Sequence, residues 1–263
     1  MQSGAVRYVA IGDSFTEGLG DERPDGSVAG WADLVARGLA AGRGEPVQYA
    51  NLAVRGRFLE PIVTEQLEEG LALSPEPTLL TLNGGGNDLM RPGCDEHRLV
   101  ELTERAVRRC AEAGVPLVLV TGSDPTRRLP MGRLVRRRGE TLTALLDDLA
   151  ERSGVVFVDV FHDVELRRPE YWAPDRLHLG PAGHRRVAGL VLAALGHTGA
   201  AHVVDPGPAA TRRVGAEARY YREHVLPWLL RRVLRRSSGA GRTGKHLHWV
   251  PVAPAAFEPE PQR

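Results

Sequence analysis

The sequence has few aromatic residues, only two cysteines, no long apolar run and almost no net charge. Aromatic residues make up 5% of the 263 residues and hydrophobic residues 42%, so we expect a core built mainly from aliphatic side chains. Two cysteines, Cys94 and Cys110, are too few for the disulfide framework of a small secreted domain. We therefore expect both thiols to be free.

Signals for export or membrane insertion are also missing. No stretch offers the roughly 18 uninterrupted apolar residues that a membrane-spanning helix needs. The first residues, MQSGAVRYVAIGDS, lack the basic and apolar regions of a signal peptide and lead directly into a segment typical of a strand. These absences predict a cytoplasmic protein.

Five short runs rich in Val, Leu and Ile alternate with longer amphipathic stretches. Each run has the length of a buried strand and is followed by turn-forming residues. Continuous apolar strands that alternate with helices are typical of a parallel sheet covered on both faces. The prediction is a three-layer α/β/α sandwich with a roughly five-stranded parallel sheet. The expected strands are Val6–Ile11, Val47–Leu52, Thr78–Leu82, Pro116–Thr121 and Val155–Val160, and the expected helices are Gly30–Gly42, Leu59–Leu73, Glu96–Gly114, Leu134–Ser153 and Ala182–Leu195.

The composition changes near Val203, which divides the chain into a predicted domain over 1–202 and an extension over 203–263. Ten basic and two acidic residues lie between Arg212 and Lys245, so a mildly acidic body carries a basic extension. We expect a linker, then an Arg-rich amphipathic helix over Glu217–Arg236, then a poorly ordered tail from Ser237. Docking of this helix on the acidic body is favoured over contact with a membrane surface, and no nucleic-acid partner is expected.

Residues that follow the strands carry the chemical information, because open parallel sheets bind ligands at the carboxyl ends of their strands. Ser14 directly follows the first strand, where a tight turn would expose its hydroxyl group. The alternative is that Ser14 is a helix N-cap, a common use of serine after a strand. Among nine histidines, we expect His178 to be the only one with an aspartate, Asp175, three residues before it in a loop; this spacing lets the carboxylate accept the imidazole Nδ1–H. An ordinary surface ion pair is the alternative there, and His184 in the next helix is expected at the surface.

Two glycine-containing loops supply further candidates. In Gly84-Gly85-Gly86-Asn87-Asp88, the glycines allow a ligand to approach the backbone and let the Asn87 amide point inward. A phosphate-binding loop is excluded because no G-K-[ST] or G-x-G-x-x-G pattern follows, whereas a plain turn stays open. Gly56, after the second strand, either offers its N–H to an anion or only supplies a turn.

In their order along the chain, these elements resemble the four sequence blocks of the GDSL/SGNH hydrolase family. Gly12-Asp13-Ser14 matches the first block, Gly56 the second, Gly84–Asp88 the third and Asp175-Arg176-Leu177-His178 the last. The first block contains G-D-S-F in place of G-D-S-L, a change that leaves the serine in position. The resemblance covers the body from about Val6 to Leu195.

This resemblance implies a flavodoxin-like sheet and a serine hydrolase mechanism without a metal or organic cofactor. Ser14 would be the nucleophile, His178 the base and Asp175 the residue that orients the imidazole. The oxyanion hole would comprise the Ser14 N–H, the Gly56 N–H and the Asn87 side-chain amide. The substrates of the family include phospholipids, thioesters, aryl esters and acetylated sugars.

The predicted function is therefore a serine esterase acting on a small-molecule ester or acylated substrate. Two alternatives remain at this stage: an acyltransferase that uses the same triad with an alcohol acceptor, and a non-catalytic lipid- or carbohydrate-binding module on the same scaffold. Asp13 and Trp172 are candidates to line the substrate cleft, and Trp172 is equally a candidate packing residue.

Overall fold

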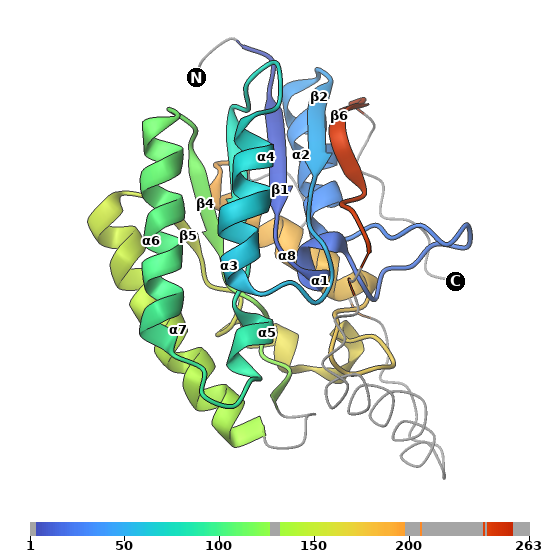
Figure 1. Ribbon diagram of the computed structural model, residues 1–263. Helices are drawn as coiled ribbons and strands as arrows, with labels where there is room; N and C mark the ends of the chain where they lie inside the picture. The colour runs from blue at the N-terminus through green and yellow to red at the C-terminus, as the bar shows by residue number, and fades with distance from the viewer. Residues whose placement is uncertain (1–3, 127–131, 198–205, 207–238, 240, 255–263) are drawn as a thin grey trace.

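A six-stranded sheet forms the centre of the protein (Figure 1). The computed structural model describes residues 4–126, 132–197, 206, 239 and 241–254. The strand order is β5-β4-β3-β1-β2-β6, in which the first five strands run parallel and β6 runs antiparallel to β2. The strands are β1 Arg7–Ile11, β2 Val47–Asn51, β3 Leu79–Leu82, β4 Leu117–Val120, β5 Val156–Val158 and β6 His246–Val252.

The strand order reverses at β1. From β1 the chain moves to β2 on one side and then returns to β3 on the other, continuing outward through β4 and β5. The loops that follow β1 and β3 therefore leave the sheet where the strand order reverses, the usual ligand position in doubly wound folds.

Helices cover both faces of the sheet. One face is covered by α2 (Trp31–Arg43) and α8 (Pro181–Ala194). The other is covered by α6 (Glu96–Glu112), α7 (Gly132–Ser153) and the helical run of α3 (Leu59–Pro61), a π-helical turn (Ile62–Gln66) and α4 (Leu67–Leu71) (Figure 1).

Strand residues alternate between the two cores. In β1, Tyr8 and Ala10 belong to the cluster under α2 and α8, whereas Val9 and Ile11 belong to the cluster on the opposite face. All four are fully buried, which explains why β1 is a continuous apolar run without polar alternation.

The α/β/α fold class and the five parallel strands predicted from the sequence are confirmed, but the sheet has a sixth strand. Residues 246–252, which we expected in a poorly ordered tail, form β6 and pair with β2 in a register that sets Val47 opposite Val252 and Asn51 opposite His246. Proline at position 251 argues against a central strand but is tolerated at an edge. The Arg-rich segment 217–236 lies outside the described residues.

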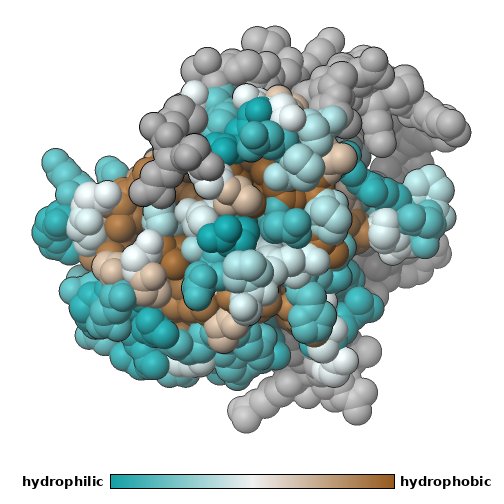
Figure 2. Space-filling view, turned by 90° about the horizontal axis from the view of Figure 1, so that it is seen from above, coloured by the Kyte–Doolittle hydropathy of each residue, from teal (hydrophilic) through white to brown (hydrophobic). Residues whose placement is uncertain are grey.

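Short elements lie at the carboxyl edge of the sheet, which faces downward in Figure 1. They include α1 (Ser14–Glu17) after β1, α5 (Gly86–Leu89) after β3, and two 3-10 turns, Glu165–Arg167 and Pro169–Tyr171, after β5. The opposite edge is seen in Figure 2, where hydrophobic residues gather near the middle of the face with hydrophilic residues around and among them. None of the helices in the described ranges has the length and apolar character required to span a lipid bilayer.

We predict that the contact between α2 and α8 contributes strongly to stability. Leu192 of α8 is fully buried, and its methyl groups lie against Gly38 of α2. Replacing Leu192 with Ala should lower the free energy of unfolding by about 2–5 kcal/mol, because it leaves a cavity between the helices. The measurement is urea-induced unfolding followed by circular dichroism.

The matched control is the same substitution at Leu134 of α7, whose exposed fraction is 44%. Leu134→Ala should change the free energy of unfolding by no more than about 0.5 kcal/mol. Equal losses in the two variants would contradict the assignment of Leu192 to the core.

Candidate active site

Three side chains, from two distant parts of the chain, are joined by consecutive hydrogen bonds. The Ser14 Oγ atom lies 3.1 Å from His178 Nε2, and His178 Nδ1 lies 2.6 Å from Asp175 Oδ2. Ser14 and His178 are 164 residues apart in the sequence. The structure thus brings together the three residues that the sequence analysis selected as nucleophile, base and orienting acid.

The hydrogen bond to Asp175 determines which ring nitrogen of His178 carries a hydrogen atom. Burial opposes ionisation of Asp175, but hydrogen bonds from the side chain and backbone of His178 outweigh it and hold the pKa of Asp175 below its ordinary value. An ionised carboxylate can only accept, so Nδ1 carries the hydrogen and Nε2 of the neutral ring is an acceptor. The hydroxyl of Ser14 therefore donates to Nε2, the arrangement in which imidazole can remove the serine proton.

A closed loop holds the acid and the base. Its ends are joined by an antiparallel bridge between Trp172 and Leu179 and by a hydrogen bond from the Ala173 N–H to the His178 carbonyl. Within the loop, Oδ1 of Asp175 accepts the backbone N–H of His178 at 3.0 Å, while Oδ2 faces the ring. The carboxylate of Asp175 therefore sets both the backbone turn and the orientation of the imidazole.

Asp13, not Ser14, is the N-cap of α1. Its Oδ1 accepts the Phe15 N–H at 3.0 Å, and Ser14 is the first helical residue. The interpretation of Ser14 as a simple N-cap is therefore wrong. The Ser14 side chain is not used to cap the helix and is directed to His178 instead.

Asn87, the second residue of α5, connects the loops after β1, β2 and β3. Its side-chain N–H groups donate to Asp13 Oδ2 and to the Arg57 carbonyl, each at 2.9 Å. The amide thus lies beside the turn that carries Ser14 and beside the loop that contains Gly56.

Gly56 occupies a left-handed turn with φ of 75°, a conformation that strongly favours glycine. The residue before it, Arg55, is tied to α1: its backbone N–H and its guanidinium both donate to the carboxylate of Glu17, at 2.7 Å and 2.5–3.1 Å. The turn that carries Gly56 is therefore fixed to the helix that begins with Ser14.

The sequence profile of the GDSL-like Lipase/Acylhydrolase family matches residues 10–186. This range contains Ser14, Gly56, Asn87, Asp175 and His178 and covers more than half of the chain. The chain belongs to this family. Membership identifies it as a carboxylic ester hydrolase. None of the curated protein sequences compared with the chain matches it.

Solved structures with the same fold include several esterases. Axe2, an acetylxylan esterase from Geobacillus stearothermophilus, aligns with a TM-score of 0.62 and 20% identity over 74% of this chain and 97% of its own. The esterase EstA from Pseudoalteromonas sp. gives a TM-score of 0.57 and 16% identity over 72% and 96% of the two chains. LAE5, an alpha/beta hydrolase from the metagenome of Lake Arreo in Spain, gives 0.59 and 24% over 74% and 98%. At these identities the likeness concerns the fold.

Neither candidate for lining the substrate cleft of the acylhydrolase is open to solvent. Trp172 is 8% exposed, belongs to the core beneath α8, and donates its indole N–H to the Leu166 carbonyl at 2.6 Å. Asp13 is 5% exposed and is engaged by Phe15 and Asn87. Trp172 is therefore a packing residue of the core. Asp13 holds the start of α1 and the Asn87 side chain in place.

His184 is buried, and the expectation that it lies at the surface is wrong. Its ring is fully inaccessible: Nδ1 accepts the Trp31 N–H at 3.2 Å, and Nε2 lies 3.0 Å from the Leu19 carbonyl, to which it donates. Burial lowers the pKa of His184, so the ring is neutral. It joins α8 both to the start of α2 and to the turn that follows α1.

A second Asp-x-x-His sequence in a loop, Asp159 to His162 after β5, shows that the expectation of only one such pair is wrong. It has nearly the same local geometry, with the His162 N–H 3.0 Å from Asp159 Oδ1 and Nδ1 2.7 Å from Oδ2. Within the described part of the chain, no serine hydroxyl bonds to its Nε2. The Asp-x-x-His spacing alone therefore does not distinguish the two pairs, whereas the Ser14 hydroxyl at Nε2 of His178 does.

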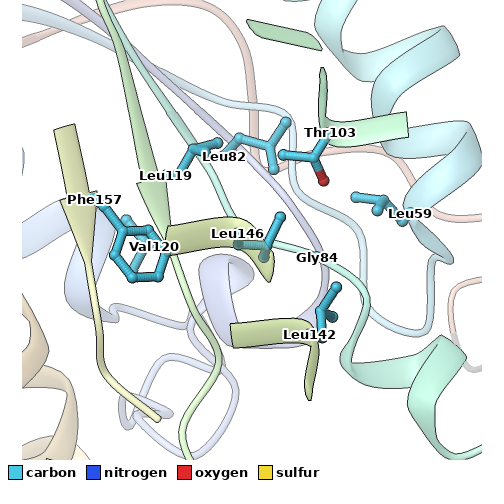
Figure 3. Close-up of a pocket in the computed structure, with 9 residues that line it drawn as sticks. All are labelled: Leu59, Leu82, Gly84, Thr103, Leu119, Val120, Leu142, Leu146 and Phe157. Atoms are coloured by element: carbon cyan, nitrogen blue, oxygen red, sulfur yellow. The ribbon is translucent and has the colours of Figure 1, made fainter. Parts of the chain in front are cut away.

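An apolar pocket lies on the α6 and α7 side of the sheet, bordering the loop that carries Asn87 (Figure 3). Its cavity volume is only about 10 Å³, room for about one water molecule, and its lining includes Leu59, Gly84, Thr103 and Leu142. The Thr103 hydroxyl donates to the Leu99 carbonyl, and no lining residue is titratable. The pocket thus carries none of the acid–base chemistry of the site.

We predict that Asp13 of the acylhydrolase makes folding less favourable as pH rises. Burial is the largest cause that raises the pKa of Asp13 from 3.8 to about 6; the nearby charges of Asp88 and Glu17 act in the same direction, and the hydrogen bond from Phe15 opposes it. A carboxyl with a raised pKa contributes stability below its unfolded pKa of 3.8, and this contribution is lost as pH rises through about 6.

Asp13→Asn removes this titration. The free energy of unfolding of the variant, relative to the wild type, should therefore increase by about 2 kcal/mol between pH 4 and pH 7. Urea unfolding at several pH values measures the difference. Parallel pH profiles for the two proteins would show that Asp13 does not titrate in this window.

Proposed function

We propose that this acylhydrolase cleaves a carboxylic ester through an acyl-enzyme on Ser14, with His178 as general base and Asp175 as the residue that orients it. The observation that carries the proposal is the 3.1 Å hydrogen bond from the Ser14 hydroxyl to His178 Nε2, because it links a nucleophile to a neutral base.

In the first step, His178 Nε2 takes the proton of Ser14 as Oγ attacks the ester carbonyl carbon. The imidazolium that forms is stabilised by the Asp175 carboxylate, 2.6 Å from Nδ1. The tetrahedral intermediate then collapses, its bond to the alcohol oxygen breaks, and His178 gives its proton to the departing alcohol.

In the second step, water replaces the alcohol. His178 removes a proton from the water as its oxygen attacks the acyl carbon, and the Ser14 oxygen leaves with that proton to restore the free enzyme. The carboxylic acid is released. No bound metal or organic cofactor takes part in either step.

The negative charge on the former carbonyl oxygen needs hydrogen-bond donors in place before the reaction. The Ser14 N–H, the Gly56 N–H and the Asn87 amide are the proposed donors. Two contacts support this grouping: Asn87 bonds to the carbonyl of Arg57, next to Gly56, and to Asp13, next to Ser14. An oxyanion would take one amide hydrogen of Asn87 from its present partner.

Small-molecule esters are the proposed substrates. Axe2, which shares the fold, is described as an acetylxylan esterase and EstA as an esterase. We propose that acetyl and butyryl esters of p-nitrophenol are turned over, and a series from acetyl to long acyl chains defines the preferred length. A cytoplasmic location also stays a prediction.

Ser14→Ala should abolish ester hydrolysis, reducing kcat/KM by about 10⁴-fold or more, since no other group replaces the nucleophile. The assay is release of p-nitrophenol from the acetyl and butyryl esters, with labelling by a fluorophosphonate probe as a direct measure of the nucleophile. The wild type should be labelled and Ser14→Ala should not.

His162→Ala is the matched control for His178→Ala, because both histidines accompany an aspartate three residues before them. We expect His178→Ala to lose activity and His162→Ala to stay within about twofold of the wild type. Equal losses in the two variants, or full activity in Ser14→Ala, would refute the proposed triad.

Asn87→Ala should reduce kcat by about 10²–10³-fold while KM changes little, because an oxyanion donor acts mainly in the transition state. Steady-state kinetics on the same esters give both constants, and thermal unfolding verifies that the variant is folded. A rise in KM without a fall in kcat would assign Asn87 to substrate binding instead.

A further inference from the structure

Lys245, directly before β6, is the only lysine of the chain; every other long basic side chain is an arginine. Its side chain is 15% exposed, and its ammonium group is surrounded by four acceptors. These are the carbonyl oxygens of Glu17, Val28 and Ala29, at 2.8, 3.2 and 2.9 Å, and Oδ2 of Asp33 at 2.5 Å.

The chemistry of this position favours lysine over arginine. A compact ammonium directs its donors to several sides, whereas a guanidinium is planar and presents its donors as a fixed fork. Burial lowers the pKa of Lys245, while the charge and hydrogen bond of Asp33 raise it. An ammonium has three N–H donors and faces four acceptors here, so one N–H is shared between two of them.

One of these acceptors, the Glu17 carbonyl, belongs to the last residue of α1, the helix that begins with Ser14. α1 has only four residues, and so short a helix is not stable alone. Its last carbonyls have no partner within the helix; the Thr16 carbonyl accepts from the Asn51 side chain at 3.0 Å and the Glu17 carbonyl from Lys245. A cation at the C-terminus of a helix is also favourable for the helix dipole.

The chain around Lys245 passes unusually close to the loop after β2. A Cβ atom on Gly244 would overlap the backbone of Asn51 and Leu52, and one on Gly239 would overlap the carbonyl of Arg55. These close approaches allow β6 to begin beside β2 and allow Lys245 to reach α1. Residues on this part of the chain therefore contact both α1, through Lys245, and the loop that leads to Gly56, through Gly239.

We propose that Lys245 is a positioning residue for Ser14: by bridging the end of α1 to the segment 28–29 and to Asp33, it holds the Ser14 hydroxyl at bonding distance from His178. The inference rests on the proposed function of Ser14. It assigns a role in catalysis to the C-terminal segment, which lies outside the matched range 10–186.

Two variants test the proposal, each with kinetics and hydrogen exchange. Lys245→Gln removes the charge but keeps a donor, and Lys245→Arg keeps the charge but changes the geometry of the donors. We expect kcat for p-nitrophenyl acetate to fall about 10- to 100-fold in both, with KM within about twofold, because a small displacement of a nucleophile acts on the chemical step. His248→Ala, at an exposed position of β6, is the control and should retain the wild-type kcat.

Hydrogen exchange reports on α1 independently of catalysis. The Gly18 and Leu19 amides both bond to the Ser14 carbonyl, and their exchange should be faster in the two Lys245 variants than in His248→Ala. An unchanged kcat in folded Lys245→Gln and Lys245→Arg would overturn the proposal, as would loss of the folded state in both, which would make Lys245 a purely structural residue.

The experiments distinguish failure of the proposed function from failure of the positioning role of Lys245. If Ser14→Ala stays active, or the wild type is not labelled by the fluorophosphonate, the proposed function is wrong whatever Lys245 does. If Ser14 is confirmed as nucleophile and the Lys245 variants turn over esters at the wild-type rate, the function stands and the positioning role is wrong.

Discussion

The hydrogen bond between Ser14 and His178 is the interaction on which the site depends, because it joins segments 164 residues apart. The serine lies on a helix of four residues and the histidine in a short closed loop. Neither element is stable by itself. The parallel sheet brings both to one edge, and side chains from other elements then fix their positions to within the fractions of an ångström that proton transfer requires.

Most of this support is polar and buried, which is costly unless every group finds a partner. Asp13 caps α1 and contacts Asn87. Asn51, at the end of β2, donates to the Thr16 carbonyl and accepts the Ala53 N–H. His184 links α8 to the start of α2 and to the turn after α1. Burial raises the pKa of Asp13, so the ionised carboxylate is costly at this position. At the same position, Asp13 accepts from the Asn87 amide and caps the helix that begins with Ser14.

The sequence predicts the parallel strands because each is a short apolar run, and it singles out Ser14, Asp175 and His178 as candidates because each follows a strand in a known order of motifs. What it does not reveal depends on tertiary contacts. His184 is polar and within a helix, so only the packed structure shows that it is buried. The bonds of Arg55 to Glu17, and of Lys245 to α1, join distant segments with no pattern in the sequence to pair them. β6 was missed because its polar and apolar residues are mixed and include Pro251, features of an edge strand rather than of a central one.

The sixth strand also determines which atoms of the sheet face solvent. β6 satisfies the outer hydrogen-bonding groups of β2 with an antiparallel partner. A chain shortened ahead of this strand would leave an open row of backbone donors and acceptors along β2, and such a row pairs readily with a second molecule. Shortened forms of the enzyme would therefore be prone to self-association. β6 thus protects the edge of β2 from pairing with another molecule, in addition to completing the sheet.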